Sequence, residues 1–377
     1  MLAIATTTFD LPSETFIRAH VRHIAPARTV LLCHEDGGAA SLGCPVLSDL
    51  RGMARARHLG ERVVNGLRFR RERFLDPALR GENEARVRGF LLRHGVQAVL
   101  AEYGPNGAQL RLACKRAGIP LFVHFHGFDA TKLARDIHWR RHYRRLFHDV
   151  AGVIAPSEFL VERLRDLGCP DGKLSVSPNG IDLSNFRKTA RENGRILAVG
   201  RLVEKKAPHL TIQAFAEVYR ARPDCTLDVV GDGPLRETCI AEINRLGLGD
   251  SVRLHGAQAP EFVRDLMSRA ELFVQHSVTA QDGDMESFGI SLTEAMACSV
   301  AVVTTDHNGF SETVVAGETG LLVAEHDVEG MARAILTLLE DPERADAMGR
   351  AGRARVEAHF THEKTAARLR EIMGLEC

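Results

Sequence analysis

Two glutamates stand eight residues apart in a short and mostly apolar stretch, MESFGISLTEAM, at residues 285–296. Glu286 precedes an aromatic-glycine turn, and Glu294 lies one turn into a helix that we expect to begin near Ser291. Because Glu294 has apolar neighbours in the sequence, its carboxylate would be partly buried and would need hydrogen-bond partners. Ribose hydroxyls would supply two such partners, and Glu286 would be placed to reach the hydroxyls of a sugar.

The turn between the two glutamates offers a second kind of contact. The first N–H groups of a helix have no partner within the helix, and they carry the positive end of its dipole. The amides in question are those of Phe288, Gly289 and Ile290, and they would face an anion. The stretch therefore predicts a site for a sugar and a phosphate.

Basic residues follow an earlier strand in the same half of the chain. In AVGRLVEKKAP, Gly200 and Arg201 come directly after the expected strand, and Lys205 and Lys206 stand at the start of the next helix. Cations at a helix N-terminus can bind a diphosphate. A solvated turn is a common alternative, so this segment indicates a phosphate site only in combination with others.

A glycine pair follows the next strand. In VVGDGPL, residues Gly231, Asp232 and Gly233 stand between a strand and a helix, and glycines let a backbone approach a ligand closely. The segment lacks the third glycine of a dinucleotide-binding fingerprint. This argues against a Rossmann dehydrogenase.

Short apolar runs alternate with amphipathic stretches of helical length along the chain. The runs that we expect to form strands are 28–35, 96–104, 120–127 and 150–157, and then 195–202, 226–233, 251–257, 271–277 and 300–306. Alternating strands and helices predict parallel sheets covered by helices on both faces. Ligands of such sheets bind at the carboxyl ends of the strands.

A polar segment rich in turn residues, LSVSPNGIDLSNFRKTARENGR, interrupts this alternation at 174–195. We interpret it as a domain boundary, and the length of 377 residues also favours two domains. The predicted fold class is α/β, with two doubly wound Rossmann-like domains at 1–184 and 185–360. With two such domains facing each other, the natural binding site is the cleft between them.

The order of these motifs resembles that of retaining glycosyltransferases of family 4, which have the GT-B fold. In the second half, the resemblance rests on GRLVEKKAP, GDGPL, the two spaced glutamates, EAMACSVAVVTTDHNGFSETV and GETGLLV. In the first half it rests on PSETFI, HFHGFDA, VIAPSEFL and SPNGID, and PSETFI, HGFDA and SVTAQDGDMES are most similar to the exopolysaccharide-synthesis branch. It implies that a final helix, 361–377, packs back on the first domain.

The resemblance also implies which residues bind the nucleotide-sugar donor. They are Arg201, Lys206, Gly231, Asp232, Gly233, Phe288, Gly289, Ile290 and Glu294. Among these, Arg201 and Lys206 would neutralise the diphosphate and make it a better leaving group. Glu294 would bind the ribose. No metal or other cofactor is expected, because arginine and lysine take the place of a metal, and the donor would be a UDP- or GDP-linked sugar.

The residues expected at the reaction centre are His126, Glu286, Arg201 and Lys206. His126 would lie over the anomeric centre, with Asp129 nearby. The family retains anomeric configuration without an agreed covalent nucleophile, so we interpret Glu286 as a positioning and electrostatic residue.

This chain departs from the family pattern in three places. Ala207 follows the lysine where the family usually has glycine, and TTTFDLPSETF stands where many members carry a glycine-rich loop. The residues expected to contact the acceptor are Thr7, Ser13, Glu14 and Asp129. Asp282 and Asp284 make another loop acidic, and a solvated loop is the preferred interpretation over contacts to an acceptor or a metal.

Two other residue pairs are not assigned a site. His124 and His126 alternate on an expected strand and would point to opposite faces, so His124 would pack under helices and the pair would bind no metal. The eight cysteines form no CxxC motif. Cys33 and Cys44 could pair, but reduced cytosolic thiols are the preferred interpretation.

Charge is unevenly distributed although the net charge is zero. Residues 1–184 hold 27 Lys+Arg against 19 Asp+Glu, a balance of +8, and the remaining residues hold 22 against 30, a balance of −8. A basic half suggests an anionic partner, such as a lipid pyrophosphate acceptor or a membrane surface, unless its arginines only solvate helix faces. Nucleic acid is not expected, because no aromatic stacking motif lies among the arginines.

No apolar run is long enough to span a membrane, and the first residues do not resemble a signal peptide. We therefore expect a cytoplasmic protein with possible peripheral contact at the inner face of the membrane. The predicted activity is hexosyl transfer with retention from a nucleotide-diphosphate sugar to a hydroxyl of a lipid-linked oligosaccharide or polysaccharide precursor. The alternatives are glycosylation of a small natural product, a nucleotide-sugar epimerase or hydrolase, and a non-catalytic binding subunit of the same fold.

Overall fold

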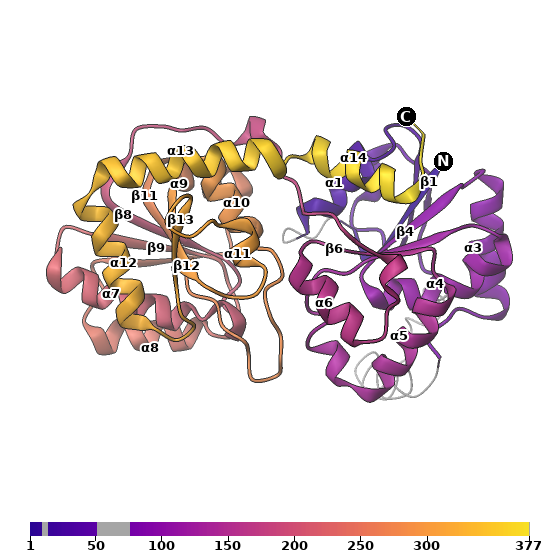
Figure 1. The fold of residues 1–377 in the computed structure, drawn as a ribbon, viewed down its shortest axis with the longest axis horizontal. Coiled ribbons are helices and arrows are strands. Elements are labelled where there is room, and N and C mark those ends of the chain that lie inside the picture. Colours follow the sequence, from indigo (N-terminus) through magenta and orange to yellow (C-terminus); the bar gives the residue numbers. More distant parts are fainter. Residues whose placement is uncertain (10–13, 51–75, 377) are drawn as a thin grey trace. The chain divides into compact units, whose positions relative to one another are not determined.

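The chain forms two compact α/β units. The structure, a computed structural model, describes residues 1–9, 14–50 and 76–376. One unit comprises Met1–Pro178 together with His362–Cys377, and the other comprises Asn179–Thr361 (Figure 1). The sequence-based boundaries lie at 184/185 and 360/361. Within the described ranges, no helix is both long enough and apolar enough to cross a bilayer.

The first unit is built on a seven-stranded parallel sheet with the strand order β3-β2-β1-β4-β5-β6-β7. Its strands are β1 (Leu2–Thr8), β2 (Thr29–Glu35), β3 (Val46–Leu47), β4 (Ala98–Glu102), β5 (Leu121–His124), β6 (Gly152–Ala155) and β7 (Leu174–Val176). Its described helices are α1 (Thr15–His23), α3 (Gly81–Arg93), α4 (Gly104–Ala117), α5 (Ile137–Asp149), α6 (Glu158–Asp166) and α14 (His362–Met373), with 3-10 turns at Ala39–Leu42, Leu133–Arg135 and Asp171–Lys173.

The second unit repeats this plan with a six-stranded parallel sheet, β10-β9-β8-β11-β12-β13. Its strands are β8 (Glu192–Val199), β9 (Thr226–Val230), β10 (Val252–Gly256), β11 (Ala270–Gln275), β12 (Ala301–Thr305) and β13 (Gly320–Val323). Its helices are α7 (Pro208–Ala221), α8 (Arg236–Leu246), α9 (Pro260–Arg269), α10 (Ile290–Ala297), α11 (Phe310–Thr313), α12 (Val328–Glu340) and α13 (Pro342–His359), with 3-10 turns at Leu183–Asn185 and Glu204–Lys206.

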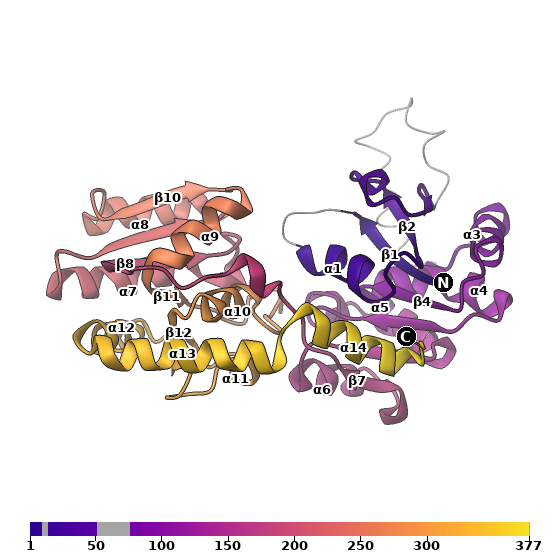
Figure 2. The same ribbon diagram turned by 90° about the horizontal axis from the view of Figure 1, so that it is seen from above.

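Apolar residues bury both faces of each sheet, as the continuous apolar runs of the sequence predict. Along β11, for example, Leu272 and Val274 pack into one apolar cluster, and Phe273 packs into a second. Neighbouring residues of a strand point to opposite faces, so the two clusters lie on opposite faces of the sheet. Figures 1 and 2 show the helices that cover them.

The strand order of each sheet places a ligand-binding point. The order reverses between β1 and β4 in the first unit and between β8 and β11 in the second. In doubly wound sheets, ligands bind at the carboxyl ends of the strands beside such a reversal. We therefore expect ligand-binding residues just after Thr8 and Glu102 in the first unit, and just after Val199 and Gln275 in the second.

The last helix belongs to the first unit. α14 lies beside α1, where the rings of His23 and His362 are 5.1 Å apart (Figure 1). The Arg370 guanidinium donates hydrogen bonds to the carbonyl oxygens of His23 and Ile24, at 3.0 and 3.1 Å. The end of the chain thus closes over the helix that follows β1.

Candidate functional site

The second unit gathers charged side chains at the carboxyl end of β8. Lys205 and Lys206 end the 3-10 turn that follows this strand, and both ammonium groups contact Glu286. The distances are 3.4 Å from Lys205 Nζ to Oε1 and 3.3 Å from Lys206 Nζ to Oε2. Burial alone would raise the pKa of Glu286, but Lys206 and Lys205 outweigh it and lower this pKa to about 2. Glu286 is therefore an anion at neutral pH.

The two lysines differ in their surroundings. Lys205 also lies 3.1 Å from Asp284, and its two carboxylate partners hold its pKa above the usual range in spite of burial. Burial lowers the pKa of Lys206, which Glu286 only partly offsets. Arg201 is exposed, and its side chain makes no hydrogen bond or ion pair among the described residues. Of the described cations in this cluster, Arg201 is thus unpaired, and Lys206 shares its one carboxylate partner, Glu286, with Lys205.

The acidic loop before Glu286 is not fully solvated, contrary to the preferred interpretation of the sequence. Asp284 is paired with Lys205, whereas Asp282 is exposed and accepts a hydrogen bond from the Asp284 amide at 3.0 Å. The polar neighbours of Asp284 indicate a solvated loop, but its partner Lys205 lies 79 residues away in the chain. Asp284 therefore anchors this loop against the lysine pair.

Glu294, the second glutamate of the segment 285–296, is partly buried, as its apolar neighbours in the sequence predict. It is the fifth residue of α10 and makes no side-chain hydrogen bond to a described residue. Burial raises its pKa to about 7, although Arg264 and Lys206 act in the opposite direction. A half-buried carboxylate without a partner is a ready acceptor for hydroxyl groups.

The turn before α10 holds three consecutive amides ready for an acceptor. Gly289 adopts a positive φ of +85° at the start of the helix. The N–H groups of Phe288, Gly289 and Ile290 have no acceptor among the residues that the structure describes. This arrangement fits an anionic or hydroxylic ligand.

The two glycine-containing loops beside the lysines are bonded to each other. Leu202 donates its backbone N–H to Asp232, and Leu235 donates to Leu202, both at 2.9 Å. Gly231 has a φ of +137°, and a Cβ there would lie 2.0 Å from the carbonyl oxygen of Gly200. Ala207 also adopts a left-handed conformation, with a φ of +40°. Glycine adopts this conformation without the steric cost that alanine bears.

Two residues of the second unit support Glu286 and were not found from the sequence. The Glu286 backbone N–H donates to His307 Nε2 at 3.1 Å, and His307 Nδ1 contacts Glu325. Glu325 also accepts a hydrogen bond from the Thr279 amide at 2.8 Å. His307 follows β12 and Glu325 follows β13, so only the fold brings them to this loop. In the sequence, His307 and Glu325 stand in separate turns, and no motif or spacing predicts that they contact each other or Glu286.

In the first unit, His126 lies just beyond β5 and is nearly buried, with 6% of its side chain exposed. Its Nε2 lies 2.8 Å from Glu102, the last residue of β4. The His124 ring lies 4.2 Å from that of His126, so the prediction that the two point to opposite faces is wrong. Residues two positions apart in a pleated strand point to the same face, and both rings accordingly lie beside the Glu102 carboxylate.

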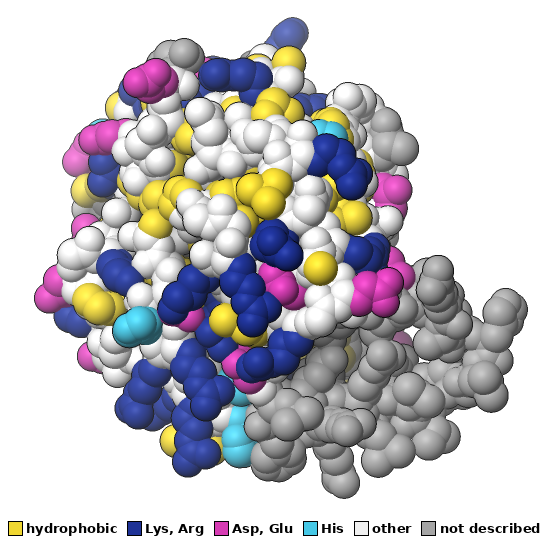
Figure 3. All heavy atoms as spheres, turned by 90° about the vertical axis from the view of Figure 1, so that its right-hand side faces the viewer, with side chains coloured by type: hydrophobic (Ala, Val, Ile, Leu, Met, Phe, Trp, Pro, Cys, Tyr) yellow, Lys and Arg dark blue, Asp and Glu magenta, His cyan; other side chains and the backbone are white. Residues whose placement is uncertain are grey.

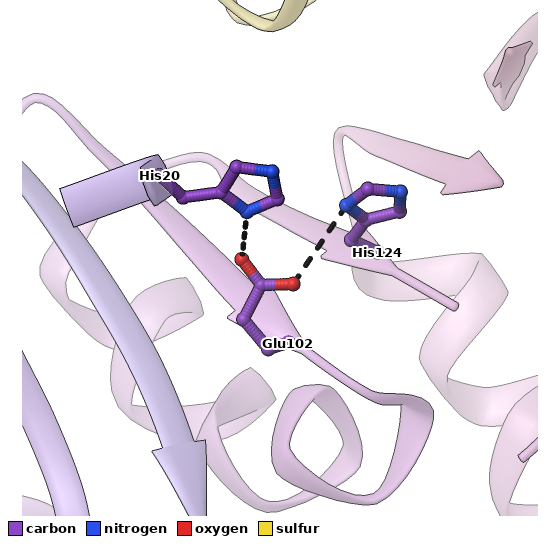
Figure 4. Close-up of side chains that lie close together, drawn as sticks. All are labelled: His20, Glu102 and His124. Atoms are coloured by element: carbon purple, nitrogen blue, oxygen red, sulfur yellow. Dashed lines mark hydrogen bonds and ion pairs between the residues drawn. The ribbon is translucent and has the colours of Figure 1, made fainter. Parts of the chain in front are cut away.

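Three residues of this region could hold a metal by their spacing. The ligand atoms of His20, Glu102 and His124 lie within 4.8 Å of one another, and Figure 4 shows both rings turned toward the carboxylate. His20 comes from α1 and was not singled out from the sequence, because 82 residues separate it from Glu102.

Cys33 and Cys44 are both free thiols and form no disulfide with each other.

The expected acceptor residues have different environments. Thr7 is exposed and bonds Asn106 at 3.3 Å, and Glu14 accepts a hydrogen bond from the Tyr103 hydroxyl at 2.9 Å. Asp129 is fully buried. Its carboxylate accepts the amides of Gly104, His126 and Gly127, at 2.9 to 3.1 Å, and so holds the His126 loop to the start of α4. Ser13 lies outside the described residues.

Two doubly wound units, one of which gathers cations, carboxylates and free amides at the ends of its strands, define the GT-B class of glycosyltransferases. Two sequence profiles match the chain, "Glycosyltransferase Family 4" over residues 14–185 and "Glycosyl transferases group 1" over residues 183–355. The chain belongs to glycosyltransferase family 4, as the sequence motifs predict.

The relatives and the solved structures agree with this family. The chain is 32% identical over 284 residues to the colanic acid biosynthesis glycosyltransferase WcaL of Escherichia coli K12, covering 73% of this chain and 69% of that protein. It is also 32% identical to WcaL of Salmonella typhimurium, over 62% of this chain and 59% of that protein, so the match spans about three fifths of the latter. The structure of Anabaena HepE with UDP and glucose shares the fold, with a TM-score of 0.77, 20% identity and 99% coverage of both chains.

Proposed function

We propose that this protein transfers a hexose, with retention of configuration, from a UDP- or GDP-linked sugar to a hydroxyl group of a lipid-linked oligosaccharide or polysaccharide precursor. The observation that supports this most is the arrangement of Lys206, Glu286 and Glu294 beside free amides within one unit. Cations suit a diphosphate, and an unpartnered carboxylate suits a ribose. The relatives' role in colanic acid biosynthesis favours a polysaccharide product.

In this proposal, Arg201 and Lys206 bind the diphosphate and stabilise the negative charge that develops on it as the sugar leaves. No metal is needed for this step, since the two cations neutralise the leaving group. The backbone amides before α10 and Glu286 orient the sugar and its phosphate. Gly231, Asp232 and Gly233 lie near the nucleotide, where the lack of side chains on the glycines lets the backbone approach it.

His126 is proposed to contact the reacting sugar, and Glu286 to position it. The acceptor hydroxyl is proposed to meet Thr7, Ser13 or Glu14. Asp129 acts there through the loop that it holds, because its buried carboxylate is fully engaged by backbone amides. Retention is tested by ¹H nuclear magnetic resonance of the first product, in which the anomeric coupling constant matches that of the donor.

We further propose that the protein is cytoplasmic and contacts the inner face of the membrane through the basic first unit. Figure 3 shows Lys and Arg side chains gathered on a face of the molecule. On α5, Arg140, Arg141, Arg144 and Arg145 are all exposed. Each basic residue near an anionic bilayer contributes about 1 kcal/mol to binding. Replacement of these four arginines by glutamine should abolish sedimentation with phosphatidylglycerol vesicles, and equal sedimentation with phosphatidylcholine vesicles would contradict the proposal.

The donor is tested by thermal shift with UDP, GDP, ADP, dTDP and their sugars, first without metal and then with magnesium. A ligand at about 100 times its dissociation constant adds roughly 2.7 kcal/mol of stability. Stabilisation by UDP or GDP without metal supports the proposed donor site. No stabilisation by any nucleotide would favour a non-catalytic binding subunit instead.

The reaction is tested with the donor so identified. Transfer to a lipid-linked acceptor supports the proposal. Turnover of the donor alone would favour an epimerase or hydrolase, and transfer only to small hydroxylated compounds would favour the natural-product alternative.

A further inference from the structure

Glu102 is a fully enclosed charged group near the reaction centre proposed above. It ends β4 with none of its surface exposed, beside the point where the strand order of the first sheet reverses. Three histidine rings surround its carboxylate: His20 from α1, His124 from the end of β5, and His126 just beyond that strand (Figure 4 shows the first two).

Two of these rings are hydrogen-bonded to the carboxylate, one on each oxygen. His20 Nδ1 lies 2.7 Å from Oε1, and His126 Nε2 lies 2.8 Å from Oε2. His124 Nδ1 is 3.7 Å from Oε2, which is beyond hydrogen-bond distance. Burial would raise the pKa of Glu102, but His20 and His126 outweigh it and hold this pKa well below its usual range. The group is therefore a carboxylate, which can only accept hydrogen bonds.

The hydrogen bond from His126 to Glu102 determines which ring nitrogen of His126 carries hydrogen. Because the carboxylate only accepts, the His126 nitrogen that faces it, Nε2, must carry hydrogen. In a neutral ring, Nδ1 then holds the lone pair, as an acceptor. The orientation of a histidine and the position of its proton are generally set by the hydrogen bond that one of its nitrogens makes.

The rest of the His126 environment leaves its ring little freedom. Phe16, Tyr103 and His124 pack around it, with ring centroids 4.3, 4.8 and 4.2 Å away. The backbone N–H is tied to Asp129 at 3.0 Å. The neighbouring rings thus already confine the imidazole of His126. The hydrogen bond to Glu102 then selects one of the two flipped orientations that this ring could adopt.

We propose that Glu102, itself held by His20, is a positioning residue that sets the orientation and proton position of His126 for glycosyl transfer. This proposal rests on the proposed function, in which His126 contacts the reacting sugar. Glu102 touches no substrate. It acts on the reaction through His126 alone.

The same cluster could hold a metal ion instead, but two features favour the hydrogen-bonded arrangement. Both carboxylate oxygens are already at hydrogen-bond distance from ring nitrogens. Metal-bound histidines also donate their second ring nitrogen to an acceptor, whereas Nε2 of His20 and Nε2 of His124 have no hydrogen-bond partner among the residues that the structure describes. The metal content of the purified protein is therefore one arm of the test.

The main test compares Glu102→Gln with wild type in the transfer assay. Glutamine keeps the size of the side chain but can turn an N–H toward His126, so the ring loses its fixed acceptor. Because small displacements at a reaction centre can cost about 100-fold, we expect kcat to fall by roughly that factor. The stabilisation by free UDP or GDP should stay unchanged, since the residues proposed to bind the nucleotide and its diphosphate belong to the second unit. Glu102→Asp, which keeps the carboxylate, should retain more activity than Glu102→Gln.

A double-mutant comparison separates positioning from a general loss of structure. If Glu102 acts through His126, Glu102→Gln should have little further effect in a His126→Ala background. An equal loss of kcat in both backgrounds would overturn the proposal. Glu84 provides a matched control, because it is a buried glutamate of the same unit that pairs with Arg116 at 2.7 Å. Glu84→Gln should leave kcat unchanged.

Failure of the inference can be told apart from failure of the proposed function. If wild type transfers no sugar from any donor, the proposed function fails first. If wild type is active and Glu102→Gln is equally active, only the inference fails. If Glu102→Gln does not fold, the comparison uses Glu102→Asp and His20→Gln, and full kcat in both would overturn the inference. One bound metal ion per chain in wild type, lost in His124→Ala, would also overturn it and assign the cluster as a cation site.

Discussion

His307 accepts a hydrogen bond from the backbone N–H of Glu286 at 3.1 Å, although 21 residues separate the two. Burial lowers the pKa of His307, which keeps the ring neutral and its Nε2 able to accept. The other nitrogen contacts Glu325, which in turn holds the Thr279 amide. The loop that carries Glu286 is thus fixed at two points by residues from the ends of two neighbouring strands.

Replacement of His307 by leucine should loosen this loop and weaken binding of the sugar more than binding of the nucleotide. One hydrogen bond of this kind is worth about 1 kcal/mol, so we expect the KM for the nucleotide sugar to rise roughly fivefold to tenfold. The affinity for free UDP or GDP, measured by calorimetry, should change little. His307→Gln, whose side-chain oxygen can accept the same bond, should restore much of the loss. Equal weakening of sugar donor and free nucleotide would show that His307 acts on the whole site.

Lys206 should contribute to diphosphate binding through its charge. A hydrogen bond to a charged group contributes about 1.5–3 kcal/mol, so Lys206→Met should weaken binding of UDP or GDP by roughly 10- to 100-fold. Binding of the corresponding nucleoside should be unaffected, because it has no phosphate. Lys188→Met is the control, since Lys188 belongs to the same unit and pairs with Asp346 at the surface. If Lys206→Met weakened nucleoside and diphosphate equally, Lys206 would not be the phosphate contact.

Nucleotide affinity should depend on pH through Glu294. Its pKa of about 7 lies above the usual value because the carboxyl is buried. Hydrogen bonds from ribose hydroxyls favour the ionised form and lower this pKa, so binding should release a proton. The affinity should therefore increase as pH rises, by about tenfold between pH 6 and pH 8 if the pKa falls to the value of a free glutamate. Calorimetry in buffers of different ionisation enthalpy measures both the affinity and the proton.

Glu294→Gln separates this effect from titration of the ligand. The phosphate groups titrate identically with both proteins, so the difference between wild type and variant reports Glu294 alone. The same raised pKa also destabilises the free protein at high pH. The folded state holds the proton more tightly than the unfolded state, so this contribution to stability is complete below about pH 4.5 and is lost as pH rises through 7. An identical pH dependence in both proteins would exclude Glu294 as the ribose contact.

The parts of the fold and site that the sequence could predict are those set by local order along the chain. The strands follow from continuous apolar runs, and the turn at Gly289 with the start of α10 follows from residues within one segment. The partial burial of Glu294 follows from its immediate neighbours. Each of these features depends on residues a few positions apart, for which hydrophobic periodicity and turn preferences are informative.

The remaining features depend on contacts between distant segments. Asp284 meets Lys205 across 79 residues, and His20 meets Glu102 across 82. Such pairs form because parallel strands place their carboxyl ends along one edge of a sheet, and a single sequence does not give the register that decides which side chains meet there. The end of β5 at His124 was likewise not visible in an apolar run that continues through Phe125.

The close approach of two loops at Gly231 makes a further prediction about stability. A Cβ at this position would lie 2.0 Å from the carbonyl oxygen of Gly200, and the φ of +137° is unfavourable for alanine. Gly231→Ala should therefore destabilise the second unit by about 3 kcal/mol, from backbone strain and overpacking together. In a unit of this size that corresponds to a fall in melting temperature of roughly 10 °C. The measurement should use circular dichroism, because the only tryptophan, Trp139, lies in the first unit. Gly249→Ala is the control, since a Cβ there would meet no atom within 4 Å, and an equal melting temperature for both variants would contradict the close approach.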